Sequence, residues 1–391
     1  MSLTSVWKSQ KGELASKHIQ AMVGLAGNDG KLRDGSKASE EFREFLANVP
    51  SSMLARYANE CLGEEKFPEA SSALQDVINE VGRRLGFKVQ NGLYRGKVNE
   101  IGNDGLWHSD DASAIILEVK TTAAYTIDLE TLANYRKKLA NEKKIESEKS
   151  SILIVVGRDE KTDSLEAQVR GSRHAWDIRL ISVDMLLRLV TVKEDLETPQ
   201  AVEKIRQILR PKEYTKVDDI IDLVFSAAKE VKEEEKLQLE SEPAEEGEKK
   251  FTPVNFREAC ITRLQAELKT VLIKRTAALF SSSDEKVGVI CLNSRRHEQG
   301  KHSKYWFAFH PHQKETVAKY PQGYVAFGCG SAELIVFVPA KEFVGWLERF
   351  WTTELEDRFY WHVRIVGDKA KLTMDTKAGF KPIDVTQYLV K

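Results

Sequence analysis

The chain has 391 residues, of which 41% are hydrophobic, 30% charged and 8% aromatic, a composition that predicts a soluble globular protein with two or three domains. The sequence contains no run of the ~18 apolar residues that a membrane span needs, and its first twenty residues lack the apolar core of a signal peptide. The four cysteines are scattered and form no CxxC pair, which favours reduced thiols in a cytoplasmic protein over a disulfide framework.

The net charge of -1 conceals an asymmetry along the chain. Residues 251–391 contain 21 Lys and Arg against 15 Asp and Glu, whereas residues 229–250 contain 5 against 9. A basic C-terminal third is consistent with an anionic partner such as nucleic acid, although ordinary charge scatter would look the same. Residues 229–250 hold no aromatic side chain, and we interpret them as a charged linker.

In chain order, residues 1–62 are expected to form an N-terminal helical region, because their apolar residues recur at helical spacing. Residues 63–228 then alternate helices with strands, which predicts an α/β domain with a mixed sheet flanked by helices. The expected elements are a helix over 70–86, a strand over 87–90, a hairpin of strands 104–107 and 114–122, a helix over 126–147, a buried strand over 150–158, a helix over 164–176, a strand over 177–183 and a helix over 182–191.

Residues 251–391 are expected to form a separate α+β domain with a mainly antiparallel sheet. It begins with a helix over 255–275 and contains a second helix over 340–351. The expected strands cover 286–294, 305–311, 323–329, 333–339 and 361–366.

The strand "AIILEVKTT", residues 114–122, places two charged residues at the end of an apolar run. Because strand side chains alternate between faces, Glu118 and Lys120 point the same way as Ile116. A buried, unpaired charge costs several kcal/mol, so the two residues either form a salt bridge with each other or belong to a functional site.

Asp104, at the start of the preceding hairpin strand, is expected to lie beside Glu118. Two adjacent carboxylates repel each other, and a divalent cation relieves that repulsion. Mg²⁺ suits such a site because it prefers oxygen ligands and retains several waters. A lysine beside the metal can orient or deprotonate an attacking water, so Asp104, Glu118 and Lys120 indicate metal-assisted hydrolysis of a phosphodiester.

With Asp104 followed by Glu118-Val119-Lys120, residues 65–190 resemble the PD-(D/E)xK nuclease superfamily, the fold of many restriction endonucleases. The expected order of elements also matches the α-β-β-β-α-β core of that superfamily. The resemblance implies that Asp104 and Glu118 bind Mg²⁺, for which Mn²⁺ can substitute, and that Lys120 positions the nucleophilic water. Asn103 departs from the family pattern, because it stands where the family name has Pro.

The resemblance also assigns Glu80, on the first helix, to the metal site, with a solvent-facing charge as the equal alternative. Asp110 and Asp111 are rival candidates for the first carboxylate, but they lie in the expected turn and Asp104 is favoured over both.

Further residues are candidates for contacts to nucleic acid. Basic residues interleaved with aromatic ones suit phosphate contact and base stacking, although the aromatic residues of one strand face must belong to a core. The candidates in the C-terminal domain are Arg295, Arg296, Lys301, Lys304, Tyr305 and Trp306. Gln168 and Arg173 resemble positions that face phosphate in related nucleases, but a solvated helix face would look similar.

Together these patterns predict a Mg²⁺-dependent DNA endonuclease that serves prokaryotic restriction or anti-phage defence, with target recognition by residues 251–391. The resemblance further implies a homodimer, since cutting both strands usually needs two active sites, and defence-system proteins as partners. Two alternatives stay open: a nonspecific nuclease activated by a ligand or partner of the C-terminal domain, and an inactive nucleic-acid-binding protein on a nuclease fold.

Overall fold

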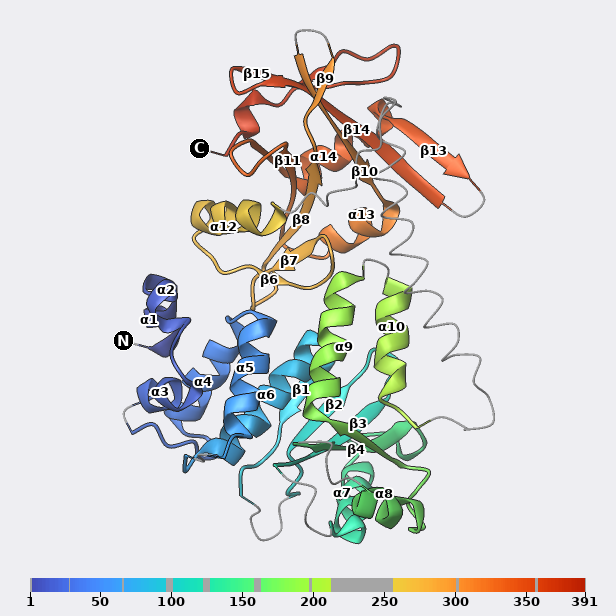
Figure 1. The fold of residues 1–391 in the computed structure, drawn as a ribbon. Helices are drawn as coiled ribbons and strands as arrows, with labels where there is room; N and C mark the ends of the chain where they lie inside the picture. The colour runs from blue at the N-terminus through green and yellow to red at the C-terminus, as the bar shows by residue number, and fades with distance from the viewer. Residues whose placement is uncertain are drawn as a thin grey trace. The chain divides into compact units, whose positions relative to one another are not determined.

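The computed structural model describes residues 2–27, 29–64, 67–95, 101–121, 127–157, 163–196, 199–211, 256–299, 302–355 and 358–390. The chain divides into two compact units, one made of residues 1–195 and 200–225 and the other of residues 196–199 and 226–391 (Figure 1). The predicted linker over residues 229–250 lies outside the described residues. None of the helices in the described ranges is both long and apolar enough to cross a membrane.

The first unit begins with a group of short helices, as predicted for residues 1–62. They are α1 Leu3–Ser9, α2 Lys11–Leu14, α3 Ile19–Leu25, α4 Lys37–Ala47 and α5 Ser51–Cys61. Aromatic residues join them, because Trp7, Phe42 and Tyr57 are fully buried and Phe45 contacts all three rings. This apolar packing accounts for the helical periodicity of the segment.

A mixed five-stranded sheet in the order β1-β2-β3-β4-β5 follows these helices. Its strands are β1 Lys88–Asn91, β2 Gly105–His108, β3 Ala114–Lys120, β4 Ser150–Val156 and β5 Ile178–Ser182. The pairs β1–β2 and β2–β3 are antiparallel, whereas β3–β4 and β4–β5 are parallel. The predicted hairpin and the predicted buried strand are confirmed, and β3 is the central strand.

Helices cover both faces of this sheet. They are α6 Ala70–Arg84, α7 Leu129–Asn141, α8 Asp163–Arg170, α9 Val183–Asp195 and α10 Pro199–Ile208. Figure 1 shows α7 and α8 on one side of the sheet, and α6 and α9 on the other. The helix predicted over residues 164–176 is too long, because α8 ends at Arg170, where Gly171 and Ser172 bond to carbonyls of the last turn and begin a loop.

The second unit contains two sheets and three helices among its described residues: α12 Arg257–Leu268, α13 Pro311–Val317 and α14 Ala340–Trp346. One sheet has the order β12-β11-β8-β7-β6, with strands β6 Ile273–Lys274, β7 Leu279–Ser281, β8 Val287–Ser294, β11 Gln322–Cys329 and β12 Ile335–Pro339. The other has the order β16-β15-β14-β10-β9, with β13 also paired to β14; its strands are β9 His297–Gln299, β10 His302–Phe309, β13 Trp351–Leu355, β14 Arg358–Asp368, β15 Lys371–Met374 and β16 Ile383–Asp384.

These pairings agree with the predicted α+β class, since β8–β11 is the parallel pair and the other pairs of this unit are antiparallel. The sequence did not reveal that the strands divide into two sheets, nor the helix α13. Short 3₁₀ turns complete the described elements of the chain at Ser147–Lys149, Leu347–Arg349 and Thr386–Tyr388.

Candidate active site

The central strand β3 leaves the apolar core at its C-terminal end. Ile116 is fully buried in a cluster that includes Leu132 of α7. Glu118, two residues further on the same face, is 8% exposed, and the side chain of Lys120 is 41% exposed. The Nζ atom of Lys120 lies 2.5 Å from Oε1 of Glu118. The strand therefore presents a carboxylate and an ammonium together at the edge of the core.

Asp104 lies directly before β2 and next to Glu118, because β2 pairs Gly105 with Leu117. Its backbone N–H donates to the carbonyl of Leu117 at 3.0 Å. Its carboxylate oxygen Oδ2 accepts a hydrogen bond of 2.6 Å from the backbone N–H of Val119. The other carboxylate oxygen, Oδ1, has no hydrogen-bond partner within the described ranges.

The electrostatics of Asp104 show that the two carboxylates are incompletely neutralised. Burial, together with the adjacent charge of Glu118, raises the pKa of Asp104 to about 7. The N–H of Val119 and the charge of Lys120 oppose this rise without cancelling it. Two carboxylates thus share one ammonium, and a bound cation would stabilise the ionised pair.

Lys120 remains protonated in this environment. Burial disfavours its charged form, but the hydrogen bond and charge of Glu118 and the charge of Asp104 outweigh burial and raise the pKa of Lys120. Tyr135 of α7 belongs to the same electrostatic environment, because burial and then the charges of Glu118 and Asp104 raise its pKa. Lys120 is therefore suited to donate hydrogen bonds to a water or a phosphate oxygen.

The donor set fits a small, hard cation. Asp104 and Glu118 supply carboxylate oxygens, and Mg²⁺ is commonly bound by one or two carboxylates together with waters. No group of three or more His, Cys, Asp and Glu side chains that could hold a metal occurs in the part of the chain that the structure describes.

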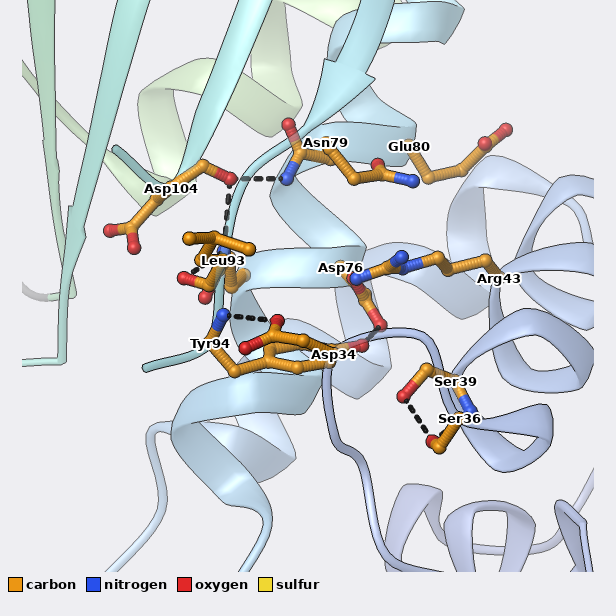
Figure 2. A network of polar contacts seen from close by, with 12 residues as sticks. Asp34, Ser36, Ser39, Arg43, Asp76, Asn79, Glu80, Leu93, Tyr94 and Asp104 are labelled. Atoms are coloured by element: carbon orange, nitrogen blue, oxygen red, sulfur yellow. Dashed lines mark hydrogen bonds and ion pairs between the residues drawn. The ribbon is translucent and has the colours of Figure 1, made fainter. Parts of the chain in front are cut away.

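The structure does not bring Glu80 to this pair. Its Oε1 lies 2.8 Å from Nε of Arg84, and its Oε2 lies 3.4 Å from Arg83. Figure 2 shows the Glu80 side chain and the Asp104 carboxylate pointing in opposite directions from α6. The face of α6 that carries Glu80 turns toward Arg84 and the N-terminal helices, so Glu80 has a structural ion pair in place of the predicted metal ligation.

The rival carboxylates lie at the opposite end of the hairpin. Asp110 and Asp111 are in the turn between β2 and β3, where Asp110 lies 3.0 Å from Lys88 and Asp111 lies 2.6 Å from Arg210. Asp104 is thus the candidate that the strand register places beside Glu118.

Gln168 and Arg173 are engaged in contacts within the first unit. The amide of Gln168 donates to the carbonyl of Ile127 at 2.5 Å and accepts from its N–H at 3.2 Å. Arg173 forms two hydrogen bonds with the carboxylate of Glu130, at 2.9 and 2.6 Å, and its side chain stays exposed. Gln168 is thus a structural residue in this arrangement, whereas Arg173 is at the surface.

In the second unit the predicted aromatic strand divides its residues between two faces. Tyr305 is 3% exposed in a core with Phe307 and Phe309, so it is not placed to stack on a base. Trp306 is partly buried on the other face, where its indole N–H donates to Nδ1 of His362 at 3.0 Å. Lys304 shares this face, Arg295 and Arg296 follow β8, and Lys301 lies outside the described residues.

The Trp306 face also carries a cationic residue. Arg364 pairs with Trp306 across β10 and β14, and its guanidinium lies 4.7 Å from the centre of the Trp351 ring. Thr353 bonds to Nε2 of His362 at 2.7 Å, so the imidazole is held by bonds at both nitrogens.

Sequence reasoning missed the polar residues of α6 that touch the hairpin, Gln75 and Asn79. Both are buried and both donate to the backbone of Asp104. Their spacing of four residues could have marked a second, polar stripe on a helix whose apolar stripe was already evident. Tyr135 had no such signal, because a single aromatic residue in a helix is ordinary.

No protein-family model matches the chain, and no curated protein matches it.

Proposed function

We propose that this protein is a Mg²⁺-dependent DNA endonuclease with a restriction-endonuclease-like first unit and the active-site residues Asp104, Glu118 and Lys120. One observation carries the proposal: two carboxylates and a lysine lie together at the ends of adjacent strands, where β2 and β3 leave the core. The order α6-β1-β2-β3-α7-β4 supports it, because it follows the α-β-β-β-α-β core of the PD-(D/E)xK superfamily.

Each side chain has a defined part in this proposal. Oδ1 of Asp104 and the carboxylate of Glu118 would hold Mg²⁺, which when bound lowers the pKa of its waters and offsets the charge of the phosphate. Lys120 keeps its proton and directs Nζ–H bonds at the attacking water and the phosphate oxygen. In this proposal Lys120 acts as an orienting donor.

The second unit is proposed to contact nucleic acid through the outer face of β10 and β14. Trp306, His362 and Arg364 combine rings with a cation there, which suits stacking on bases together with contact to phosphate. The assignment to restriction or anti-phage defence, and the homodimer, follow from the family resemblance alone.

A second candidate function is a nuclease gated by a ligand. A cavity of about 360 Å³ in the second unit is lined mostly by apolar and aromatic residues, among them Val317, Tyr320, Tyr324, Pro339 and Val344. A small molecule in this cavity would contact both α13 and α14, so it could change their packing.

The test compares cleavage of modified and unmodified phage and plasmid DNA by wild type, Glu118→Ala and Lys120→Ala, with Mg²⁺, with Mn²⁺ and with EDTA. Each variant is expected to lose cleavage by on the order of 100-fold or more. Lys149→Ala is the matched control, because it removes an exposed lysine that lies 2.9 Å from Glu146.

Undiminished cleavage by Lys120→Ala and Glu118→Ala would refute the assignment of the active site. No cleavage of any DNA by wild type would favour the gated nuclease or an inactive nucleic-acid-binding protein. In that case DNA binding by wild type and Trp306→Ala separates the two, since stacking is worth ~1–3 kcal/mol per base.

A further inference from the structure

The backbone carbonyl of Asp104 accepts hydrogen bonds from three donors. The N–H of Gly92, which directly follows β1, donates at 3.1 Å. The side-chain amides of Gln75 and Asn79, one turn apart on α6, donate at 3.0 and 2.9 Å. Figure 2 shows the Asn79 amide directed at this carbonyl and the Asp104 carboxylate turned away from α6. One backbone atom is therefore held from a strand and from a helix.

The two amides also bond to other parts of the β1–β2 segment. Gln75 donates to the carbonyl of Leu93 at 3.3 Å, and Oδ1 of Asn79 accepts from the indole N–H of Trp107 at 3.0 Å. Trp107 is fully buried, so this acceptor is fixed in place. The two amides thus bond to Leu93, before the connection between β1 and β2, and to Asp104 and Trp107, after it.

Glycine at position 105 permits this close approach. A Cβ atom at Gly105 would lie 2.2 Å from Oδ1 of Asn79, far inside van der Waals contact. Any larger residue would push the Asn79 amide away from the hairpin. Glycine at position 105 therefore allows α6 to lie this close to the start of β2.

The donors are neutral, although α6 carries charged residues nearby. Arg83, the next residue on the same side of the helix, donates to Asn91 at 2.8 Å. Amides hold the backbone without changing the charge of the pair.

We propose that Gln75 and Asn79 are positioning residues, which hold the main chain of Asp104 so that its carboxylate stays beside Glu118. This inference rests on the proposed function for its catalytic meaning. The placement of the carboxylate itself has a separate reporter, because the N–H of Val119 donates to Oδ2 of Asp104 at 2.6 Å.

The experiment uses the full chain with Gln75→Met and Asn79→Leu, singly and together, which remove the donors with little change of volume. Arg83→Gln is the matched control, since it changes a polar residue on the same side of α6 that does not bond to Asp104. The readouts are hydrogen exchange of the Val119 amide without metal or DNA, and kcat and KM for cleavage. Exchange across residues 150–156 of β4 serves as the reference for global stability.

In the double variant, Val119 exchange is expected to rise by about 10-fold or more relative to β4. The kcat is expected to fall by on the order of 100-fold with little change in KM, because misplacement affects the reacting groups and not DNA binding. Each single variant is expected to lie between wild type and the double variant, and Arg83→Gln is expected to match wild type.

Unchanged Val119 exchange in the double variant would overturn the proposal. If wild type cuts no DNA, the proposed function fails while the Val119 result still decides whether the amides position Asp104. If the double variant does not fold, Gly105→Ala displaces the Asn79 amide with the core of α6 intact, and the same rise in Val119 exchange is required of it.

Discussion

Two groups of carboxylates lie in the first unit, and they are neutralised in different ways. Asp76 and Glu80 of α6 are buried, and each lies 2.8 Å from Nε of an arginine, Arg43 and Arg84 respectively. Among the described residues, Asp104 and Glu118 share a single cation, the half-exposed Lys120. The first group has a cation for every carboxylate, and the second does not.

The difference distinguishes a structural ion pair from a binding site. Arg84 also donates to the carbonyls of Leu46 and Val49, so its charge and its hydrogen bonds are satisfied within the fold. Such a pair holds the N-terminal helices on α6 and leaves nothing for a ligand. Within the described ranges, the Asp104–Glu118 pair has one cation for two carboxylates and a carboxylate oxygen without a hydrogen-bond partner. A metal ion could supply the missing positive charge and bind that oxygen.

The largest expected effect concerns the structural group. Glu80→Leu should lower the free energy of unfolding by ~3–5 kcal/mol, because it leaves Arg84 buried without its counter-charge. Glu118→Gln should change it by no more than about 1 kcal/mol, since it removes a repulsion along with a partly exposed ion pair. Urea unfolding of both variants measures this contrast, and equal losses would break the comparison.

Asp104→Asn should stabilise the protein in a way that depends on pH. The folded-state pKa of about 7 lies above the ordinary value of 3.8, so Asp104 lowers the free energy of unfolding progressively as pH rises from about 4 to about 7, and the loss is complete above pH 7. Below about pH 4 the carboxyl is protonated in both states and the substitution should have little effect. Above pH 7 the gain should be on the order of 4 kcal/mol. Metal-free unfolding at pH 4 and pH 8 tests this, and a gain at pH 4 would contradict it.

Adding Mg²⁺ should stabilise the wild type and leave Glu118→Gln largely unaffected. A free concentration about fivefold above Kd gives about 1 kcal/mol through mass action. Thermal unfolding with MgCl₂ and with EDTA measures the difference, with Glu80→Leu as a variant that should keep the response. An equal response in all three proteins would place the ion elsewhere.

The smallest effect is expected for an exposed ion pair. Arg173→Ala removes the pair with Glu130, whose two side chains are 72% and 51% exposed. Water and salt screen such a pair, so the free energy of unfolding should hardly change. A loss of stability as large as that of Glu80→Leu would show that burial does not determine how much an ion pair contributes to the free energy of unfolding.

The sequence by itself was sufficient for the local features of the candidate site. Strand alternation placed Glu118 and Lys120 on one face, and the hairpin between Asp104 and Glu118 set them side by side. Both depend on residues close together in the chain, so period and turn chemistry suffice to predict them. The same alternation placed Tyr305 and Trp306 on opposite faces of their strand, but it did not indicate which face would belong to the core.

Only the tertiary structure decided what surrounds each of these residues. The sequence showed the apolar stripe of α6, whereas the fold buries the helix between the N-terminal helices and the sheet, so its polar residues divide between two neighbours. Arg84, which pairs with Glu80 one turn away on α6, therefore meets the carbonyls of Leu46 and Val49, while Gln75 and Asn79 meet the backbone of Asp104. A helical period gives the direction of a side chain relative to its own helix, but the partner on that side comes from segments far away in the chain.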